Sequence, residues 1–411
     1  MSLAKCRFCG ETLKHSFVNL GMSPLANSYL EFEQLQQMEP FYPLHVYVCE
    51  NCYLVQLQEF EAPNNIFSQY AYFSSYSETW LEHARIYTQL MIERFGLDSD
   101  SEVIELGSND GYLLQYFREM NIPVLGIEPA KNVAKVAEAA GIPTIVTFFG
   151  SEVATRLRSE GRQADLLVGN NVLAHVPELN DFVEGMRILL KPQGLITMEF
   201  PHLMRLIAES QFDTIYHEHF SYFSFINVKK VFAEWGLIIF DVEELPTHGG
   251  SLRIYARNAE DNTKAVSQRV LDLLEREVDA GFTELSYYLS FGDRVKKTKR
   301  NILDFMIRAK EKNETIVGYG APAKGNTLLN YCGISTDFIE YTVDLNPYKQ
   351  GRFLPGSHIP IYSPEKVVET KPDYLLILPW NLKDEIIQQM HFVRDWGCKF
   401  LLLIPQVEVV G

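Results

Sequence analysis

The sequence predicts an α/β protein built around a doubly wound parallel sheet, with a small cysteine-bearing module before it and a second α/β domain after it. Strand and helix patterns alternate through the middle of the chain, as in a parallel sheet with helices on both faces. A glycine-rich turn follows a strand near residue 107 and again near residue 320. Two Cys-x-x-Cys pairs stand close to the N-terminus. We expect four segments: 1–77, 78–205, 206–300 and 301–411.

Length and composition narrow the classes of function. The chain has 411 residues, 46% of them hydrophobic and 12% aromatic, which is enough for two or three full-sized cores. Its net charge of -16 argues against nucleic acid or an anionic membrane as the main partner. We see no signal-peptide pattern and no run of 18 apolar residues, so we expect a cytoplasmic protein that binds no membrane. The sequence is compatible with a monomer.

The N-terminal module carries Cys6 and Cys9 in one pair and Cys49 and Cys52 in another. Each pair lets two thiolates face one ion, and two pairs complete a tetrahedron around zinc. Disulfides and a redox pair are the alternatives, but both fit poorly with two spaced pairs in a chain lacking an export signal. Since four protein ligands leave no open position, we expect a structural zinc ion.

A tyrosine-rich stretch around Tyr70 and Tyr72 joins this module to the central sheet. It has two interpretations that the sequence leaves equally open. The tyrosines either pack in a connector or line the mouth of the cofactor site. An amphipathic helix over 80–95 then leads into the central sheet.

The central sheet begins with the apolar run 103–106, followed by a turn with glycines at 107 and 111. The spacing Glu-x-Gly-x-x-x-Gly differs from the Gly-x-Gly-x-x-Gly of dinucleotide binders. It resembles the first motif of class I methyltransferases, which use S-adenosylmethionine (SAM). The strand 124–127 ends in Glu128, whose carboxylate can accept both hydroxyls of a ribose. The expected cofactor residues are Glu105, Gly107, Asn109, Gly111, Glu128 and Asn170, with Phe148 or Phe149 over the adenine unless they pack in the core.

Titratable and aromatic side chains crowd the run 212–224, with Tyr216, His217, Glu218 and His219 in succession. A His-x-His pair can ligate a metal, and a histidine beside a carboxylate can serve as an acid or base. A hydrogen-bonded turn is the third interpretation. Farther on, the glycines of the segment 248–251 precede a strand, and their exposed amides could hold an oxyanion or a phosphate.

Charged helical sequence fills about 260–310, and a fresh strand with a Gly-x-Gly turn follows at 315–320. The helix after this turn begins near Lys324, which could cradle a phosphate. The next strand ends in Asp344. These features predict a second, Rossmann-like fold.

Seven motifs in this order resemble the sugar C-methyltransferases of deoxysugar biosynthesis, which act on nucleotide-linked ketosugars. They are the paired Cys-x-x-Cys, ELGSNDG, NNVLAH, FDTIYHEH, HGGS, GYGAPAKG and VDLNP, and they span almost the whole chain. The resemblance implies a zinc-binding N-terminal domain, a SAM-binding class I methyltransferase domain, and a C-terminal domain that helps to bind the nucleotide sugar, with dTDP as the expected nucleotide.

The resemblance also assigns roles to residues. His219 would be the base that makes an enolate and Glu218 would orient it, while Tyr216, His175 and Tyr70 or Tyr72 would contact the sugar. His219 is preferred to His217 because Glu218-His219 carries the family pattern, whereas alternation along an extended segment puts both histidines on one face. An O- or N-methyltransferase on a related sugar, or a non-catalytic SAM- or sugar-binding protein, are the alternatives. The expected substrate-binding residues are His248, Gly249, Gly250, Ser251, Tyr319, Lys324, Asn326 and Asp344.

Overall fold

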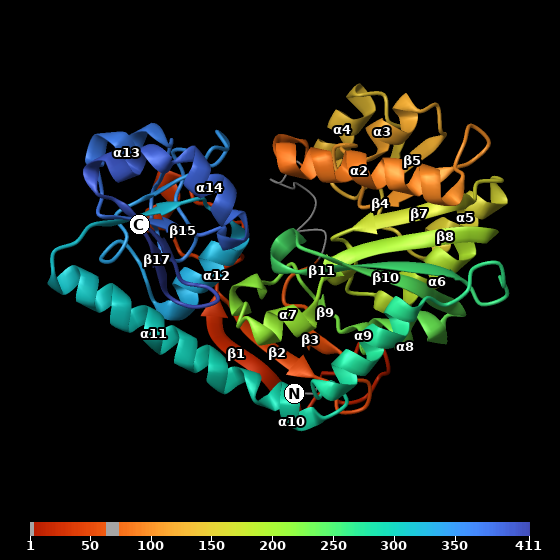
Figure 1. The fold of residues 1–411 in the computed structure, drawn as a ribbon, viewed down its shortest axis with the longest axis horizontal. Helices are drawn as coiled ribbons and strands as arrows, with labels where there is room; N and C mark the ends of the chain where they lie inside the picture. The colour runs from red at the N-terminus through yellow and green to blue at the C-terminus, as the bar shows by residue number, and fades with distance from the viewer. Residues whose placement is uncertain (1–3, 63–73) are drawn as a thin grey trace.

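The computed structural model describes residues 4–62 and 74–411, which form three sheets (Figure 1). The smallest sheet is antiparallel and has the order β1-β2-β3-β9. Its first three strands come from the N-terminal module, but its fourth comes from far along the chain. The strands are β1 (His15–Ser23), β2 (Tyr42–Val48), β3 (Val55–Leu57) and β9 (Ser221–Tyr222).

The central sheet has seven strands in the order β10-β11-β8-β7-β4-β5-β6. The five strands from β8 to β6 are parallel, whereas β11 and β10 are antiparallel additions at one edge. This is the expected doubly wound sheet. Its strands are β4 (Val103–Leu106), β5 (Val124–Ile127), β6 (Thr144–Ile145), β7 (Ala164–Asn170), β8 (Leu190–Pro201), β10 (Leu237–Leu245) and β11 (Ser251–Asn258).

Helices cover both faces of the central sheet (Figure 1), and its inner strands are therefore buried on both sides. All four residues of β4 and of β5 are buried, as their continuous apolar runs predict. The helices of this part are α2 (Glu78–Phe95), α3 (Leu114–Glu119), α4 (Lys131–Ala139), α5 (Ser151–Ser159), α6 (Leu179–Leu189), α7 (Leu203–Ala208), α8 (Phe225–Glu234) and α9 (Gln268–Asp279). Short 3-10 helices are η1 (Phe32–Gln36), η2 (Ser74–Tyr76), η3 (Leu173–His175), η4 (Phe212–Thr214) and η5 (Thr247–Gly249).

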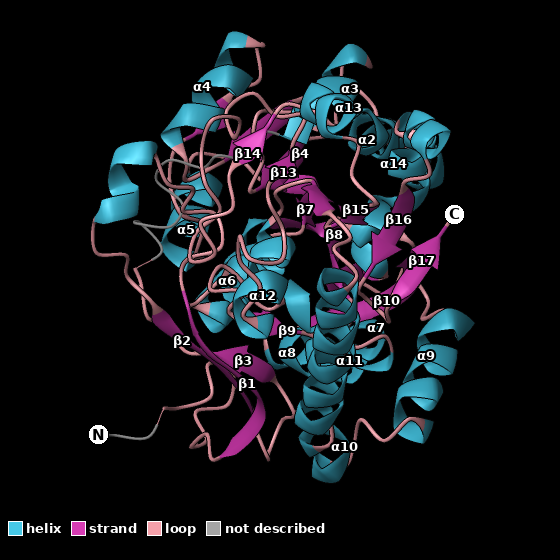
Figure 2. Ribbon diagram, turned by 90° about the vertical axis from the view of Figure 1, so that its left-hand side faces the viewer, coloured by secondary structure: helices cyan, strands magenta, loops and turns pink. Residues whose placement is uncertain are grey.

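The sheet extends beyond the expected boundary at residue 205. Strands β10 and β11 lie in the segment expected to be a substrate-site insertion and connector, yet they pair with β8. The four segment boundaries remain a prediction. The connector proper is helical, with α10 (Leu285–Leu289) and α11 (Phe291–Glu311). Figures 1 and 2 show α11 running past the N-terminal sheet toward the C-terminal sheet.

The third sheet has the order β14-β13-β12-β15-β16-β17 and is parallel except for β17, giving the expected second Rossmann-like unit. Its strands are β12 (Ile316–Tyr319), β13 (Thr342–Val343), β14 (Ile361–Tyr362), β15 (Tyr374–Ile377), β16 (Lys399–Leu402) and β17 (Glu408–Val410). Its helices are α12 (Ala323–Cys332), α13 (Glu365–Thr370) and α14 (Lys383–Gln389), with 3-10 helices η6 (Trp380–Leu382) and η7 (His391–Trp396).

One hydrophobic core joins the N-terminal sheet to the C-terminal sheet. Phe17 of β1 stacks on Phe291 of α11 with ring centroids 4.6 Å apart, and both side chains are buried in the cluster that continues into β12 and β15. The two outer sheets therefore stabilise each other through shared apolar burial.

None of the helices in the described part of the chain combines the length and the apolar character needed to cross a membrane.

Candidate functional site

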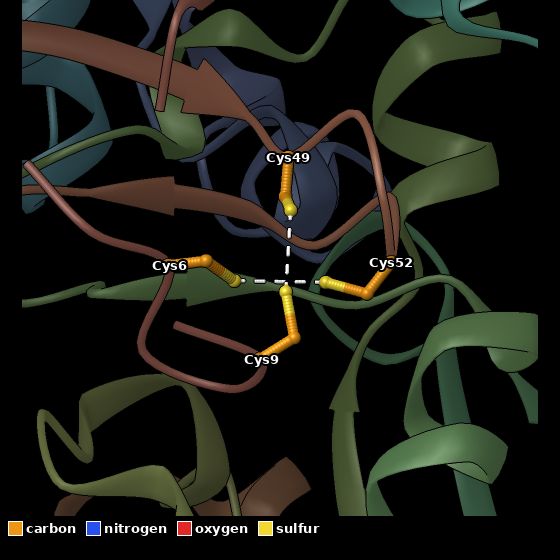
Figure 3. A group of neighbouring side chains, drawn as sticks. All are labelled: Cys6, Cys9, Cys49 and Cys52. Atoms are coloured by element: carbon orange, nitrogen blue, oxygen red, sulfur yellow. Dashed lines mark hydrogen bonds between the residues drawn. The ribbon is translucent and has the colours of Figure 1, made fainter. Parts of the chain in front are cut away.

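The four cysteines of the N-terminal module form one cluster, with their sulfur atoms all within 4.8 Å of one another. Figure 3 shows the sulfurs pointing toward a common centre. Tetrahedral zinc with Zn–S bonds of about 2.3 Å needs sulfurs roughly 3.8 Å apart, and the sulfurs of Cys6 and Cys52 are 3.6 Å apart. The cluster therefore fits a zinc ion with four protein ligands, and that set leaves no position for a substrate.

Arg7 lies between the first two cysteines and contacts residues of the central part of the chain. Its guanidinium donates to the carbonyls of Leu57 at 2.5 Å and Pro177 at 2.9 Å, and lies 5.5 Å from the Phe220 ring centroid. From the second pair, the Cys52 carbonyl accepts from Asn227 at 3.0 Å. The zinc module thus contacts the chain on either side of the histidine-rich run. Sequence reasoning missed Arg7, and its place inside a Cys-x-x-Cys pair is the signal that could have found it.

The glycine turn after β4 is held by Glu128 at the end of β5. The two carboxylate oxygens of Glu128 accept from the backbone amides of Asn109 at 2.9 Å and Ala130 at 2.8 Å. Gly107 has a positive φ of 66°, and a Cβ at Gly111 would lie 2.9 Å from Ile142. Gly111 also has a positive φ, of 82°, so both glycines serve the turn and the second in addition permits close packing.

Several buried polar atoms around this turn have no hydrogen-bond partner among the described residues. They are both carboxylate oxygens of Glu105, the Ser108 hydroxyl, Oδ1 of Asp110 and both amide atoms of Asn170. Leaving such a group unpaired costs about 1–3 kcal/mol, so this set fits a polar ligand at the carboxyl ends of β4 and β7. Burial raises the pKa of Glu105 well above its ordinary value, and the charges of Glu128 and Asp110 raise it further.

The two phenylalanines expected near the adenine have different surroundings. Phe149 packs edge-on against Phe182, with centroids 5.4 Å apart, as part of the core. Phe148 is 42% exposed and remains available to cover a ligand.

His219 lies at the centre of an aromatic cluster. Its Nδ1 is 3.0 Å from the Thr214 carbonyl, so Nδ1 carries the proton and Nε2 is the basic nitrogen. The rings of Tyr216 and His175 have centroids 4.1 Å and 4.8 Å from that of His219. Burial lowers the pKa of His219 well below its ordinary value, and a positive charge on His175, His248 or Lys324 would lower it further. The ring is therefore neutral at neutral pH.

The side chain of Glu218 points to the N-terminal module, where Oε1 accepts from Asn27 at 2.6 Å. Its backbone carbonyl accepts from Nδ1 of His175 at 2.9 Å. The contact that fixes the His219 ring comes from the Thr214 carbonyl, whereas the family resemblance assigns this role to Glu218. Burial lowers the pKa of His175 to about 4.

His217 lies in different surroundings from His219. Its Nε2 is 3.3 Å from the Pro43 carbonyl, and its ring packs against Tyr42 and Phe60 of the N-terminal module. Among residues 4–62 and 74–411, the cysteine cluster is the one group of three or more metal-ligand side chains close enough to hold an ion. The pair of histidines therefore forms no metal site with the described residues.

The segment 248–251 uses much of its polar surface internally. The Gly250 amide and the Ser251 hydroxyl both donate to the Thr247 carbonyl, at 2.9 Å and 3.0 Å. A Cβ at Gly249 would lie 2.3 Å from the Trp380 ring, so this glycine permits contact with the C-terminal sheet. His248 points to the central sheet, with Nε2 3.1 Å from the Asn171 side-chain amide.

Lys324, on α12 of the C-terminal part, places a positive charge near His219 and His248. Its Nζ donates to Asn381 at 2.7 Å and lies 4.5 Å from the Trp380 ring centroid. The Trp380 indole donates to the Asp213 carboxylate at 2.6 Å. Burial lowers the pKa of Lys324 to about 8, although the charge of Asp213 raises it. The charge of Lys324 lowers the pKa of His248 and His219, as expected of a near neighbour.

Three other residues expected at the substrate site are engaged within the fold. The Tyr319 hydroxyl donates to Gln389 at 3.1 Å, the Asn326 amide donates to the Ala26 carbonyl at 2.6 Å, and the Asp344 carboxylate accepts from the Ala321 amide at 2.7 Å. Tyr70 and Tyr72 lie outside the described residues.

A buried ion-pair network at the end of β8 was not expected from the sequence. Glu199 accepts from His83 of α2 at 2.9 Å and from Nε of Arg253 at 2.7 Å. Trp80 stacks on His83 with centroids 4.8 Å apart and lies edge-on to His248 at 5.3 Å. An acid within a largely apolar stretch of strand, Glu199 of β8, is the signal that could have found it.

Three family models match consecutive parts of the chain. They are described as “Putative zinc binding domain” over residues 6–67, “Methyltransferase domain” over 80–241 and “C-methyltransferase C-terminal domain” over 246–405. The first contains all four cysteines of the cluster. The second contains the parallel part of the seven-stranded sheet, in agreement with a class I methyltransferase fold.

The chain is similar to a curated protein along almost its entire length. “C-methyltransferase NovU” of Streptomyces niveus is 36% identical over 407 residues, which are 99% of this chain and 97% of that protein. “Ubiquinone biosynthesis O-methyltransferase” of Bartonella tribocorum is 28% identical over 96 residues, which are 23% of this chain and 39% of that protein.

Solved structures of methyltransferases match part of the chain. Magnesium protoporphyrin IX methyltransferase from Synechocystis PCC 6803 with bound SAM has a TM-score of 0.34 at 14% identity, over 43% of this chain and 79% of its own. The CcbJ methyltransferase from Streptomyces caelestis has a TM-score of 0.34 at 12% identity, over 43% of this chain and 89% of its own.

The cysteine cluster predicts one zinc ion per chain. Replacing Cys49 by Ser should remove the metal and lower the melting temperature by at least about 10 °C, because structural zinc contributes its binding energy to folding. Elemental analysis and calorimetry measure both effects. Cys332→Ala, in the C-terminal core, is the control and should retain the zinc. A Cys49→Ser protein with full zinc content would contradict this assignment.

The buried carboxylate of Glu105 predicts that binding of SAM releases a proton. Burial raises the pKa of Glu105 in the free protein, and a cationic ligand favours the ionised form, so affinity should increase as pH rises through the range in which Glu105 of the free protein titrates. Calorimetry in two buffers with different ionisation enthalpies measures the proton release. Glu105→Gln should abolish the release and weaken binding by about 1.5–3 kcal/mol. Equal binding enthalpies in both buffers for the unmodified protein would refute the role of Glu105.

Proposed function

The chain belongs to the SAM-dependent C-methyltransferase family, and we propose that it methylates a carbon atom of a nucleotide-linked ketodeoxysugar, with dTDP as the expected nucleotide. The observation that supports this most is the state of His219. It is a buried, neutral imidazole whose Nδ1 is occupied by a backbone carbonyl and whose Nε2 is left basic. Methylation of carbon requires such a base, because a proton must leave the carbon next to the ketone first.

His219 acts as the general base in this proposal. Its Nε2 takes the proton from the carbon beside the ketone, and the electron pair of the broken C–H bond forms the carbon–carbon double bond of an enolate. The negative charge moves to the former ketone oxygen. Tyr216 and His175, whose rings surround His219, are the groups we assign to positioning the sugar.

The methyl donor is bound at the carboxyl ends of β4, β5 and β7. Glu128 holds the glycine turn, and the unpaired side chains of Glu105 and Asn170 offer contacts to the donor's polar groups. When bound, SAM supplies a methyl group on a positively charged sulfur, which keeps the electron pair of the S–C bond as the enolate carbon takes the methyl group. Phe148 is the side chain we assign to covering the adenine.

The nucleotide sugar is assigned to the region between Lys324 and the histidines. Lys324 can neutralise negative charge on the substrate, which the overall charge of -16 otherwise disfavours. The zinc ion has a structural role in this proposal. It holds the module whose β3 pairs with the strand that follows His219.

Methylation of oxygen or nitrogen on a related sugar is the alternative. It requires less base strength and could use the same histidine. The similarity to an O-methyltransferase covers 23% of the chain, against 99% for the C-methyltransferase, so C-methylation is favoured. A non-catalytic binding protein would have no use for the basic Nε2 of a buried His219.

The first test compares His219→Ala with His217→Ala. The His219 variant should lose exchange of the sugar's α-proton with deuterated water, and methyl transfer should fall by about 10²–10⁴-fold, the usual contribution of a general base. It should still bind SAM and the nucleotide sugar. His217→Ala is the matched control, since its ring packs on the N-terminal module, and should keep a measurable share of both activities. The reverse ranking would move the base away from His219.

The second test uses the charge of Lys324. The base is active when neutral, so exchange is lost as pH falls through the pKa of His219, and this acid limb should lie well below the ordinary histidine range. Lys324→Met removes a positive neighbour, which raises the pKa of His219 and should move the acid limb to higher pH. The pH profile of α-proton exchange measures the shift, with exposed Lys371→Met as the control. An unchanged or lowered limb in Lys324→Met would contradict the proximity of these two groups.

A further inference from the structure

His248 lies beside Asn171 and Trp80, and the steps described above give it no part. Its Nε2 contacts Asn171, which directly follows the end of β7, and its ring contacts Trp80 of α2. The loop that holds Asn171 continues into η3, whose His175 has its ring centroid 4.8 Å from that of His219. A charge on His248 would also lower the pKa of His219. His248 therefore faces the same region as the proposed base.

The hydrogen bond to Asn171 fixes the position of the ring proton. An amide NH₂ group can only donate, so Nε2 of His248 accepts at 3.1 Å and the proton of the neutral ring lies on Nδ1. Burial lowers the pKa of His248 to about 4, and the charge of Lys324 lowers it further. His248 is therefore a neutral imidazole with one N–H donor.

Both partners of this hydrogen bond have left-handed backbone conformations. The φ angle is 54° at His248 and 56° at Asn171. A non-glycine residue in this region costs on the order of 1–3 kcal/mol, and such residues concentrate at functional sites. The strain places the imidazole where the amide of Asn171 can reach Nε2.

The weak basicity of His219 is a chemical reason to expect a hydrogen-bond donor near the ketone oxygen of the substrate. An imidazole of lowered pKa is a weak base, and the α-proton of a ketone is a weak acid, so transfer needs stabilisation of the enolate oxygen. Neutral imidazoles can polarise a carbonyl in this way.

We propose that His248 is a further catalytic residue, whose Nδ1–H donates a hydrogen bond to the ketone oxygen and holds it as it becomes the enolate oxygen. This inference rests on the proposed C-methylation. The proton stays on Nδ1 throughout, and the hydrogen bond strengthens as negative charge develops on the oxygen. Asn171 is the positioning residue that keeps the proton on Nδ1.

Three variants test this role without disturbing the backbone. Glycine and asparagine tolerate a positive φ, so His248→Gly removes the donor and His248→Asn keeps an amide donor near the position of Nδ1. Asn171→Asp presents an acceptor to Nε2, which moves the ring proton from Nδ1 to Nε2. Asn313→Asp, at an exposed residue with a φ of 59°, is the control for the same change elsewhere.

The readouts are α-proton exchange and methyl transfer with a dTDP-linked ketodeoxysugar, together with ¹⁵N NMR of the histidine rings. We expect His248→Gly and Asn171→Asp to lower the turnover number about 10²–10³-fold, the usual effect of losing one oxyanion donor, with KM changed much less. His248→Asn should recover a large part of the rate. In the unmodified protein, NMR should find the His248 proton on Nδ1, and on Nε2 in Asn171→Asp.

The outcomes separate the two proposals. An unmodified protein that exchanges and methylates the sugar, together with a His248→Gly variant of equal turnover, would refute the role of His248 alone. An NMR spectrum with the proton on Nε2 in the unmodified protein would refute it as well. An unmodified protein that binds SAM but neither exchanges nor methylates these sugars would refute the proposed function, and the role of His248 with it.

Discussion

The pairing of β3 with β9 is the interaction on which the arrangement of this protein depends. The Leu57 amide donates to the Phe220 carbonyl at 3.0 Å, directly after His219 in the chain. On one side of this pairing, the cysteine cluster and Arg7 fix β3. On the other side, the Thr327 hydroxyl donates to the Ile215 carbonyl, and Trp380 holds Asp213. The histidine-rich run is thus anchored to both outer sheets while it faces the central one.

The region around His219 combines opposite charges with neutral rings. The chain carries a net charge of -16, and this region contains the acids Asp213 and Glu218, but also the positive Lys324 and neutral histidines. Burial keeps the imidazoles neutral, since removing water disfavours their charged form. Each neutral ring keeps one acceptor nitrogen and one donor nitrogen. A backbone carbonyl determines which nitrogen of His219 and of His175 is the donor, and the side-chain amide of Asn171 determines it for His248. A region of this kind suits chemistry in which negative charge develops on a substrate oxygen.

Local motifs made much of the fold predictable. Cysteine spacing predicted the cluster of four sulfurs, and a glycine or an acid after an apolar run predicted where β4 and β5 end. The roles of Glu105, Gly107 and Glu128 at the donor site remain a prediction. Long-range contacts were not predictable. β9 is two residues long and pairs with a strand more than 160 residues earlier, which leaves no periodic pattern. The Thr214 carbonyl that orients His219 has no sequence signature, because every residue has a carbonyl.

The shared core has a consequence for the order in which this protein folds during synthesis. The sheet of the zinc module lacks its fourth strand until residue 222 has left the ribosome, and its apolar face packs on helix α11 and the C-terminal sheet, which are made later still. The first segment to emerge is therefore among the last to be completed. The cysteines can bind zinc and order the structure around it early. The apolar surface of the module, however, is buried only after the C-terminal part of the chain has been synthesised. The nascent protein thus exposes, for most of its translation, apolar surface that the finished fold buries, and such surface favours aggregation.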